Sequence, residues 1–282
     1  MMAPMPMVLL GGNDIKELAA RYGIRPTKQR GQNFVTDPNT VRMIVSHAHL
    51  QPDDVVVEVG PGLGSLTLAL LQTVAAVVAV EVDSALAAAL PFTVEHKLAP
   101  VASRLHMVHA DALTVQELPC EPTAMVSNLP YNVAVPVLLS FLERFPSIER
   151  VLVMVQAEVA DRLAAAPGSR TYGVPSVKAQ WYADVSKVAT IGRNVFWPAP
   201  NVDSALVFLQ RREQPAANRT TAFRLIDAGF AQRRKTLRSA LASALGGSEA
   251  AAAALQQAGI EPSARAEVLS VEHWARLAEV CS

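Results

Sequence analysis

The sequence predicts an α/β fold with a mainly parallel sheet, followed by a small all-helical domain. Three observations support this prediction. Up to residue 212, short apolar runs typical of buried strands alternate with helical patterns. One of these runs, residues 55–59, leads directly into a turn that holds three glycines. Beyond Arg212 only helical patterns remain, including the alanine-rich stretch 249–258.

The most informative stretch is VVVEVGPGLG, residues 55–64. Branched apolar residues predict a buried parallel strand. Glycines directly after such a strand let the backbone turn sharply and approach a ligand closely. The apolar run 66–80 supplies the next helix and the start of the next strand. Such a strand, turn and helix are typical of a nucleotide-type cofactor site, and a tight turn without a ligand is the alternative.

The remaining elements follow from the same patterns. A helix is expected over residues 15–22, and Asp37 with Pro38 predicts the start of a helix that runs to about residue 49. The further expected elements are a strand over 76–81, a helix over 82–90, strands over 105–109 and 124–127, a helix over 135–144 and a strand over 151–155. Residues 185–191 and 205–209 are expected to pair as a closing hairpin. We therefore expect a basic N-terminal extension over 1–30, a Rossmann-like domain over 31–212 and a helical domain over 213–282.

Composition bounds the possible functions. The chain has 282 residues, of which 51% are hydrophobic and 18% charged, and its formal net charge is zero. Any nucleic-acid-binding surface must therefore be local. The two cysteines, Cys120 and Cys281, predict neither a disulfide framework nor a cysteine zinc site. No signal peptide or membrane span is expected, so the predicted location is the cytoplasm.

Polar residues stand at the ends of three expected strands, at the edge where parallel sheets bind ligands: Glu81, Asp111 and the motif that begins at Asn128. Glu81 lies one helix and one strand beyond the glycine turn, where an acid can bind a ribose diol; a surface acid is the alternative. Asp111 follows the third strand and suits an adenine amino group, although alone it is weak evidence. His106 and His109 are read as side chains on opposite faces of a strand, so no metal site is predicted.

The sequence Asn128-Leu129-Pro130-Tyr131 follows the fourth strand. An exocyclic amino group of adenine is a poor nucleophile because its lone pair is delocalised into the ring. The Asn128 side-chain oxygen and the Leu129 carbonyl can accept hydrogen bonds from the N–H groups of this amino group. They can also stabilise the positive charge that develops on its nitrogen during methyl transfer. Tyr131 offers a flat face for a flipped-out base. The alternative is a proline turn with an asparagine cap.

These motifs together resemble the S-adenosylmethionine-dependent ribosomal RNA adenine dimethyltransferase family, and its small-subunit branch most closely. The resemblance spans residues 30–240 and implies a Rossmann-like class I methyltransferase fold. Further matching segments are GQNFVTD at 31–37 and the stretches 156–163, 169–177, 196–205 and 230–238. The implied reaction transfers two methyl groups to each of two adjacent adenines near the 3′ end of small-subunit ribosomal RNA in a late assembly (pre-30S) particle. A monomer without metal is expected.

The resemblance also implies roles for individual residues. The implied cofactor-binding residues are Gln32, Asn33, Val35, Gly60, Gly62, Glu81, Asp111, Ala112 and Asn128. The implied catalytic residues are Asn128, Leu129, Pro130, Tyr131 and Phe196. The chain departs from the family pattern at Ala157, Ala199 and Asn201, where Lys, Pro and Lys are expected. These departures affect the stiffness of a loop and a contact with phosphate that the resemblance implies.

Three other functions compete with this interpretation. A dinucleotide oxidoreductase shares the glycine turn and the ribose acid, but it favours G-x-G-x-x-G and leaves the Asn128 motif unexplained. The sister family that methylates large-subunit RNA and confers macrolide resistance shares the fold and the chemistry. The third possibility is a ribosome assembly factor whose binding matters more than its catalysis.

A local basic surface is predicted on one helix over residues 230–245. Its helical periodicity places Arg234 inside a buried stripe with leucines, as a structural residue. The residues expected to contact RNA phosphate are Lys28, Arg30, Arg233, Lys235 and Arg238. A solvated basic helix face is the alternative.

Overall fold

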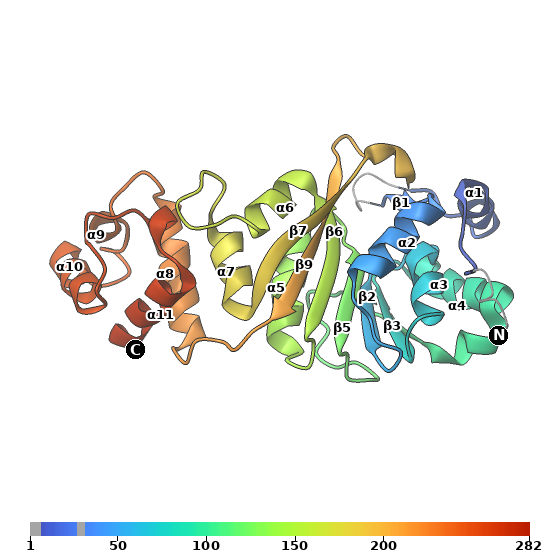
Figure 1. The fold of residues 1–282 in the computed structure, drawn as a ribbon, viewed down its shortest axis with the longest axis horizontal. Helices are drawn as coiled ribbons and strands as arrows, with labels where there is room; N and C mark the ends of the chain where they lie inside the picture. Colours follow the sequence, from blue (N-terminus) through green and yellow to red (C-terminus); the bar gives the residue numbers. More distant parts are fainter. Residues whose placement is uncertain (1–6, 27–31) are drawn as a thin grey trace. The chain divides into compact units, whose positions relative to one another are not determined.

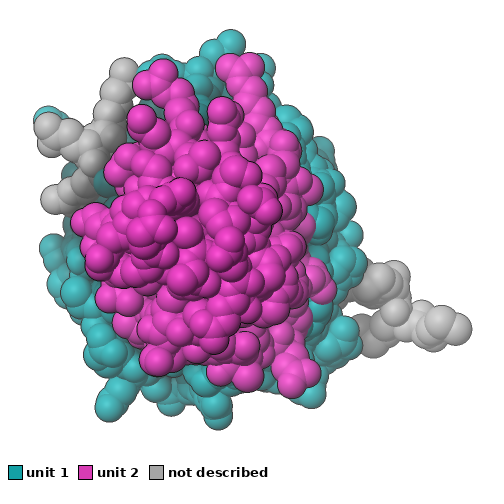
Figure 2. Space-filling model, turned by 90° about the vertical axis from the view of Figure 1, so that its left-hand side faces the viewer, with its two compact units in different colours: residues 1–160, 186–211 teal, residues 161–185, 212–282 magenta. Residues whose placement is uncertain are grey.

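The chain folds into two units, and neither is a single continuous segment (Figure 2). The computed structural model describes residues 7–26 and 32–282. Unit 1 contains residues 1–160 and 186–211, and unit 2 contains residues 161–185 and 212–282. Unit 2 therefore combines residues 212–282 with residues 161–185, whereas the helical domain is expected over 213–282 alone. The expected N-terminal extension groups with unit 1.

Aromatic contacts explain why residues 161–185 join the helical unit. The hydroxyl of Tyr172 donates a hydrogen bond to the Leu269 carbonyl at 2.9 Å. The ring of Trp181 packs edge-on against Phe223, with 5.8 Å between centroids. Tyr172 and Trp181 are both buried. Burial of such large side chains makes a strong contribution to packing, so this segment is part of the core of unit 2.

Unit 1 is built around a seven-stranded sheet in the order β4-β3-β2-β5-β6-β9-β7 (Figure 1). Strands β2 to β6 pair in parallel, and β9 runs antiparallel to β6. The strands are β2 (Val55–Val59), β3 (Ala76–Glu81), β4 (Leu105–His109), β5 (Ala124–Asn128), β6 (Arg150–Gln156), β7 (Ala183–Ile191) and β9 (Ser204–Arg211). The expected pairing of 185–191 with 205–209 is confirmed, because β7 and β9 are neighbours.

The strand order reverses between β2 and β5. From β2 the chain proceeds through β3 to β4 on one side, whereas β5 is followed by β6 on the other. Right-handed crossovers place the connecting helices of the two halves on opposite faces. The carboxyl ends of β2 and β5 therefore border the crevice where ligands bind in such sheets. The helices of unit 1 are α1 (Gly12–Arg21), α2 (Pro38–His47), α3 (Ser65–Leu71), α4 (Ser84–Leu98), α5 (Ala134–Arg144) and the first residues of α6 (Ala157–Leu163), with a 3₁₀ turn η2 (Ala99–Arg104).

Local signals explain where these helices begin and end. The Asp37 carboxylate accepts the Thr40 N–H at 2.8 Å and caps α2, as expected. Helix α3 is buried along its whole length, which explains why its sequence is apolar apart from Ser65 and Thr67. Helix α4 runs eight residues past its predicted end, through Pro91. Its buried stripe continues to Leu98, and the packing of that stripe offsets the hydrogen bond lost at the proline.

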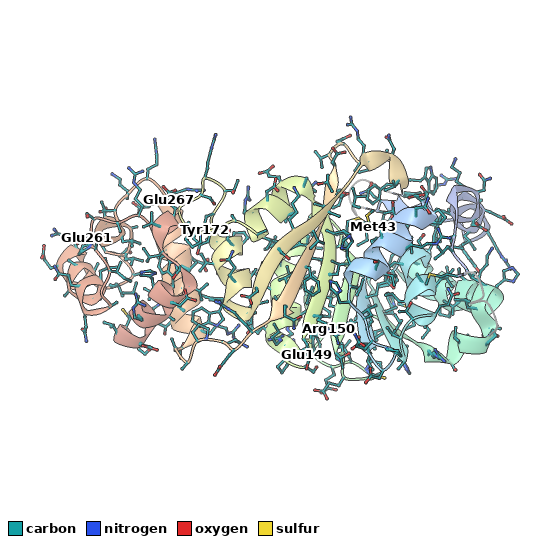
Figure 3. The ribbon with its side chains drawn as sticks, in the orientation of Figure 1. Met43, Glu149, Arg150, Tyr172, Glu261 and Glu267 are labelled. Carbon is teal, nitrogen blue, oxygen red and sulfur yellow. The ribbon has the colours of Figure 1, made fainter. Side chains whose placement is uncertain are left out.

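An ion pair stabilises the end of the sheet that lies opposite the ligand-binding edge. Arg150, labelled in Figure 3, lies at the start of β6. It donates to the Asp54 carboxylate at 2.7 Å, and the side chains are 15% and 4% exposed. Its other amino group donates to the His49 carbonyl. This pair lies at the amino end of the strands, away from the ligand-binding edge, and we assign it to stability.

A second, two-stranded sheet joins distant segments of unit 1. Strand β1 (Phe34–Val35) pairs antiparallel with β8 (Phe196–Trp197), which follows the 3₁₀ turn η3 (Arg193–Val195). The Ser65 hydroxyl at the start of α3 donates to the Val35 carbonyl at 2.7 Å. Strand β1 is thereby held against the helix that follows the glycine turn.

Unit 2 is helical, as expected, but its basic segment is not the predicted helix. Helix α8 ends at Ala231, and a turn separates it from α9. The N–H groups of Leu237 and Arg238 bond to the carbonyls of Ala264 and Pro262, not to their own preceding turn. Arg234 is exposed, so its predicted burial is wrong. The helices of the unit are α7 (Val174–Tyr182), α8 (Arg219–Ala231), α9 (Leu237–Ala240), α10 (Ser248–Gln257), α11 (Val271–Val280) and the 3₁₀ turn η4 (Ala266–Val268). In the described part of the chain, no helix is long and apolar enough to span a bilayer.

Candidate functional site

A cavity, here called the glycine-loop cavity, opens at the carboxyl ends of β2, β3 and β5. It lies at the point where the strand order reverses, as the sequence predicts. Its lining residues are Gln32, Asn33, Phe34, Val35, Glu58, Gly60, Pro61, Gly62, Leu63, Ser65, Leu66, Glu81, Val82, Asp83, Leu86, Asn128 and Pro130. It thus brings together most of the residues predicted to bind a cofactor.

The glycines of the turn are required by backbone geometry. Gly60 and Gly62 have φ angles of 69° and 57°, a region that residues with a side chain rarely adopt. A Cβ atom on Gly62 would also lie 2.8 Å from the Phe34 ring. The turn therefore packs tightly against β1 and exposes its backbone to the cavity.

Two buried carboxyl groups form one wall of the cavity. Glu81, at the end of β3, is 6% exposed, and Glu58, within β2, is 2% exposed. Burial raises the pKa of Glu81, although N–H groups including that of Asp83 at 2.9 Å counteract this shift. Burial raises the pKa of Glu58 to about 8, against a hydrogen bond from the Thr67 hydroxyl at 2.6 Å. Among the lining residues no basic side chain occurs, and Asp83 lies beside Glu81, so the cavity suits a cationic ligand even with a proton on Glu58.

The stability of the ligand-free protein should decrease as pH rises between about 4.5 and 8. In this range the folded state holds a proton on Glu58 that the unfolded state has released, so raising the pH favours unfolding by up to about 1.4 kcal/mol per pH unit for one group. Glu58→Gln should flatten this slope in urea melts recorded from pH 5 to 8.5. The exposed Glu95→Gln serves as control, and an unchanged slope in Glu58→Gln would show that Glu58 does not titrate in this range.

Asn128 has a fixed side-chain orientation. Its amide nitrogen donates to the Asn33 carbonyl at 3.0 Å, so its amide oxygen points elsewhere and is left to accept a hydrogen bond. Asn33 directly precedes β1, and Asn128 ends β5. Residues from two distant motifs therefore meet at one hydrogen bond, beside the glycine-loop cavity.

A second cavity, here called the tyrosine cavity, shares Gln32 and Asn33 with the first. Its lining residues are Gln32, Asn33, Tyr131, Asn132, Gln156, Pro198, Ala199, Pro200, Asn201 and Val202. The Tyr131 hydroxyl lies 2.6 Å from the Ser204 Oγ, and burial raises the pKa of the phenol. Ala199 and Asn201, two of the departures from the family pattern, lie on the rim of this cavity.

Some predicted site residues lie outside both cavities. Phe196 is 4% exposed and belongs to the core of unit 1, where it pairs with Val35 across the small sheet. Leu129 is also buried, which leaves only its backbone for a contact. Asp111 and Ala112 do not line either cavity, and Asp111 accepts the Leu113 N–H at 2.8 Å. Lys28 and Arg30 lie outside the described residues.

Sequence reasoning missed several residues of the glycine-loop cavity. The sequence pattern indicates Glu58 only as part of a strand, whereas in the structure Glu58 lines the cavity from β2. Asp83 accepts a hydrogen bond from Gln32 at 3.4 Å, which joins the N-terminal motif to the start of α4. Val82 is 64% exposed, unusual for valine, and it lines the cavity. An acid within a hydrophobic strand and an apolar residue between two acids were the available signals.

The predicted RNA-binding residues of unit 2 differ in their pairing. Arg233 donates to Glu267 at 3.0 Å, and Arg238 forms an ion pair with Glu249. Lys235 is exposed and has no carboxylate partner in the part of the chain that the structure describes, and the same holds for Arg234, which the sequence predicts to be structural. Glu267 and Tyr172 mark this region in Figure 3. Within residues 233–238 the unpaired charge is therefore carried by Arg234 and Lys235.

Comparison with protein families gives a match over residues 25–282 to a family described as ribosomal RNA adenine dimethylase. Two similar relatives come from Streptomyces avermitilis and Streptomyces griseus, and both are named ribosomal RNA small subunit methyltransferase A. They are 64% and 65% identical over 99% and 97% of this chain, respectively, and over 96% of each relative.

Two solved structures share the fold. A dimethyladenosine transferase from Plasmodium falciparum has a TM-score of 0.76 and 22% identity, over 86% of this chain and 95% of its own. The 23S rRNA methyltransferase ErmE has a TM-score of 0.65 and 28% identity, over 88% of this chain and 99% of its own. The α/β fold predicted from the strand and helix pattern is confirmed.

Proposed function

The chain belongs to the ribosomal RNA adenine dimethylase family, and on this basis we propose that it dimethylates N6 of two adjacent adenines near the 3′ end of small-subunit (16S) ribosomal RNA. The observation that carries this proposal is the fixed amide of Asn128, which lines the glycine-loop cavity, donates to Asn33, a residue shared by both cavities, and keeps its oxygen for a ligand. The names of the curated relatives favour the small subunit over the large-subunit substrate of ErmE.

The glycine-loop cavity fits S-adenosylmethionine as methyl donor. This cofactor supplies an activated methyl group on a positively charged sulfur, and the carboxyl groups of Glu81 and Asp83 in the cavity lining favour positive charge. The exposed backbone of the glycine turn can approach the ligand closely. Glu81 suits the ribose hydroxyls, and Val82 offers an apolar face to the adenine ring. Gln32, Asn33 and Val35 close the cavity from the N-terminal side. Asp111 and Ala112, beyond this lining, keep their implied role at the cofactor adenine as part of the proposal.

The tyrosine cavity is assigned to the target adenine. Tyr131 stacks on the flipped-out base, and the turn at Pro130 holds that ring beside Asn128. The Asn128 oxygen and the Leu129 carbonyl accept hydrogen bonds from the two N–H groups of the amino group. These bonds direct the nitrogen lone pair toward the methyl group of the donor. Phe196 supports this site from the core through its pairing with β1.

The proposed partner is an assembling small ribosomal subunit (a pre-30S particle) in the cytoplasm, approached by a monomer that uses no metal. In the described residues no group of three His, Cys, Asp or Glu is placed to hold a metal ion. A role in subunit assembly accords with this substrate and is compatible with catalysis.

The decisive test is methylation of undermethylated small subunits with labelled S-adenosylmethionine, followed by mapping of the modified bases. We expect label in dimethyladenine at two adjacent positions near the 3′ end. Label in large-subunit RNA instead would favour the macrolide-resistance type of activity. Tight binding to subunits without transfer would favour the non-catalytic assembly role.

RNA binding should depend on the unpaired cations of unit 2. The double variant Arg234→Ala/Lys235→Ala should weaken binding to small subunits and reduce the slope of log K against log salt by about 0.7–0.9 per lost phosphate contact. The ion-paired Arg233 and Arg238 remain proposed contacts with smaller expected effects.

The matched control removes the same charge from unit 1, in the exposed pair Lys16 and Arg104. Cofactor affinity and melting temperature should stay constant in both double variants. If the Arg234/Lys235 variant keeps the wild-type salt slope, the RNA surface lies elsewhere.

A further inference from the structure

Gln156 is a polar residue without an assigned role in the tyrosine cavity. It ends β6, is half-buried, and lines the cavity together with Tyr131. Its side-chain amide has no hydrogen-bond partner in the portion of the chain that the structure describes. A half-buried amide that faces a cavity without a partner is poised to bind a ligand that offers hydrogen-bonding groups.

The sheet register places Gln156 on the same face as Asn128. Asn128 is paired in register with Met154 on the neighbouring parallel strand. Gln156 lies two residues beyond Met154, and alternate residues of a strand point to the same face. A strand separation of about 4.8 Å and a rise of about 3.3 Å per residue put the Cα atoms of Asn128 and Gln156 roughly 8 Å apart. A planar base fits between two side chains at this separation.

Besides Asn128 and Gln156, Tyr131 borders this space, and a buried hydroxyl group holds Tyr131 in place. Ser204 on β9 is paired in register with Gln156 on β6, and Ser204 is fully buried. Its Oγ lies 2.6 Å from the Tyr131 hydroxyl. Tyr131 and Gln156 are therefore both anchored to Ser204, one by a hydrogen bond and one by strand pairing, so their relative position is defined.

We infer that Gln156 orients the ring of the target adenine by donating a hydrogen bond from its amide to N1 or N7, the ring nitrogens that flank the amino group. This inference rests on the proposed function. Asn128 and Leu129 occupy the amino hydrogens, so a ring acceptor is what remains for an amide donor. One methyl group on N6 leaves one flanking nitrogen uncovered. Two methyl groups crowd both flanking nitrogens. The hydrogen bond from Gln156 is therefore available during the first and the second methyl transfer and is weakened in the dimethylated product.

The test uses Gln156→Met, which keeps a long side chain but removes the donor. With subunits reconstituted from unmodified RNA, kcat/KM for the RNA should fall roughly 3- to 10-fold, the loss expected for one neutral hydrogen bond, while KM for the methyl donor stays unchanged. With the target adenines replaced by 1-deazaadenine or 7-deazaadenine, one analogue should lower wild-type activity by a similar factor. With that analogue Gln156→Met should cause no further loss.

The matched control is Gln51→Met, an exposed glutamine at the amino end of the sheet, which should behave as wild type. If wild type and this control methylate the subunits and Gln156→Met equals them, Gln156 does not contact the base. Additive losses with both deaza analogues would also overturn the inference. If wild type itself transfers no methyl group to small subunits, the proposed function fails, and the inference with it.

Discussion

Replacing Asn128 with alanine is expected to reduce turnover by roughly 10²–10³-fold, the usual loss for one group that hydrogen-bonds in the transition state. The amide is held by the Asn33 carbonyl at 3.0 Å, so its oxygen requires no reorganisation when charge develops on the adenine nitrogen. Single-turnover methylation of undermethylated subunits measures this loss directly. Because the oxygen acts mainly in the transition state, cofactor affinity should decrease far less.

The control for this variant is Asn13→Ala, an exposed asparagine on α1. It should retain wild-type turnover, and both variants should bind small subunits normally. A drop of less than tenfold in Asn128→Ala would remove Asn128 from its catalytic role. An equal loss in cofactor affinity would instead make it a residue that binds donor and transition state alike.

Replacing Glu81 with alanine is expected to weaken S-adenosylmethionine binding by roughly 10- to 100-fold, since a hydrogen bond to a charged group contributes about 1.5–3 kcal/mol. The structure adds a second reason for this loss. Glu81 also accepts the Asp83 N–H at 2.9 Å, so its removal frees the turn that leads into α4 and carries Val82. Calorimetry with the purified protein gives the affinity.

Two companion variants separate these effects. Glu81→Gln keeps an acceptor for the Asp83 N–H and should lose less affinity than Glu81→Ala. Glu95→Ala, exposed on α4, removes the same charge away from the cavity and should bind normally. Unchanged affinity in Glu81→Ala with the fold retained would contradict the assignment of Glu81 to the ribose.

The strand ends were the most predictable part of this protein. In a parallel sheet the residue after each strand must lie at one edge, so Glu81 and Asn128 could be placed together from the chain alone. The contact between Asn33 and Asn128 could not be predicted from spacing, because it depends on the pairing of β1 with β8. Phe196 illustrates the same limit: the resemblance implies an aromatic side chain around the target adenine, and the structure pairs Phe196 with Val35 and leaves it 4% exposed.

The segment around Arg234 shows how tertiary hydrogen bonds override a local pattern. The leucine spacing fits one continuous helix, and Leu237 and Leu241 are indeed buried. The N–H groups of Leu237 and Arg238, however, bond to carbonyls about 25 residues away in sequence, which requires the turn before α9. Helical periodicity carries no information about such partners, so the register that buried Arg234 was wrong.

The divided sequence of unit 2 has a consequence during synthesis of the chain. Tyr172 is made 97 residues before Leu269, whose carbonyl accepts its hydrogen bond. At about 5–20 residues per second this delay amounts to roughly 5–20 s. Through that interval Tyr172 lacks this hydrogen bond, and Trp181 waits 42 residues for the Phe223 ring, although β2 to β6 are already complete. The nascent chain therefore presents these two aromatic side chains to solvent and to chaperones while its parallel sheet can already form.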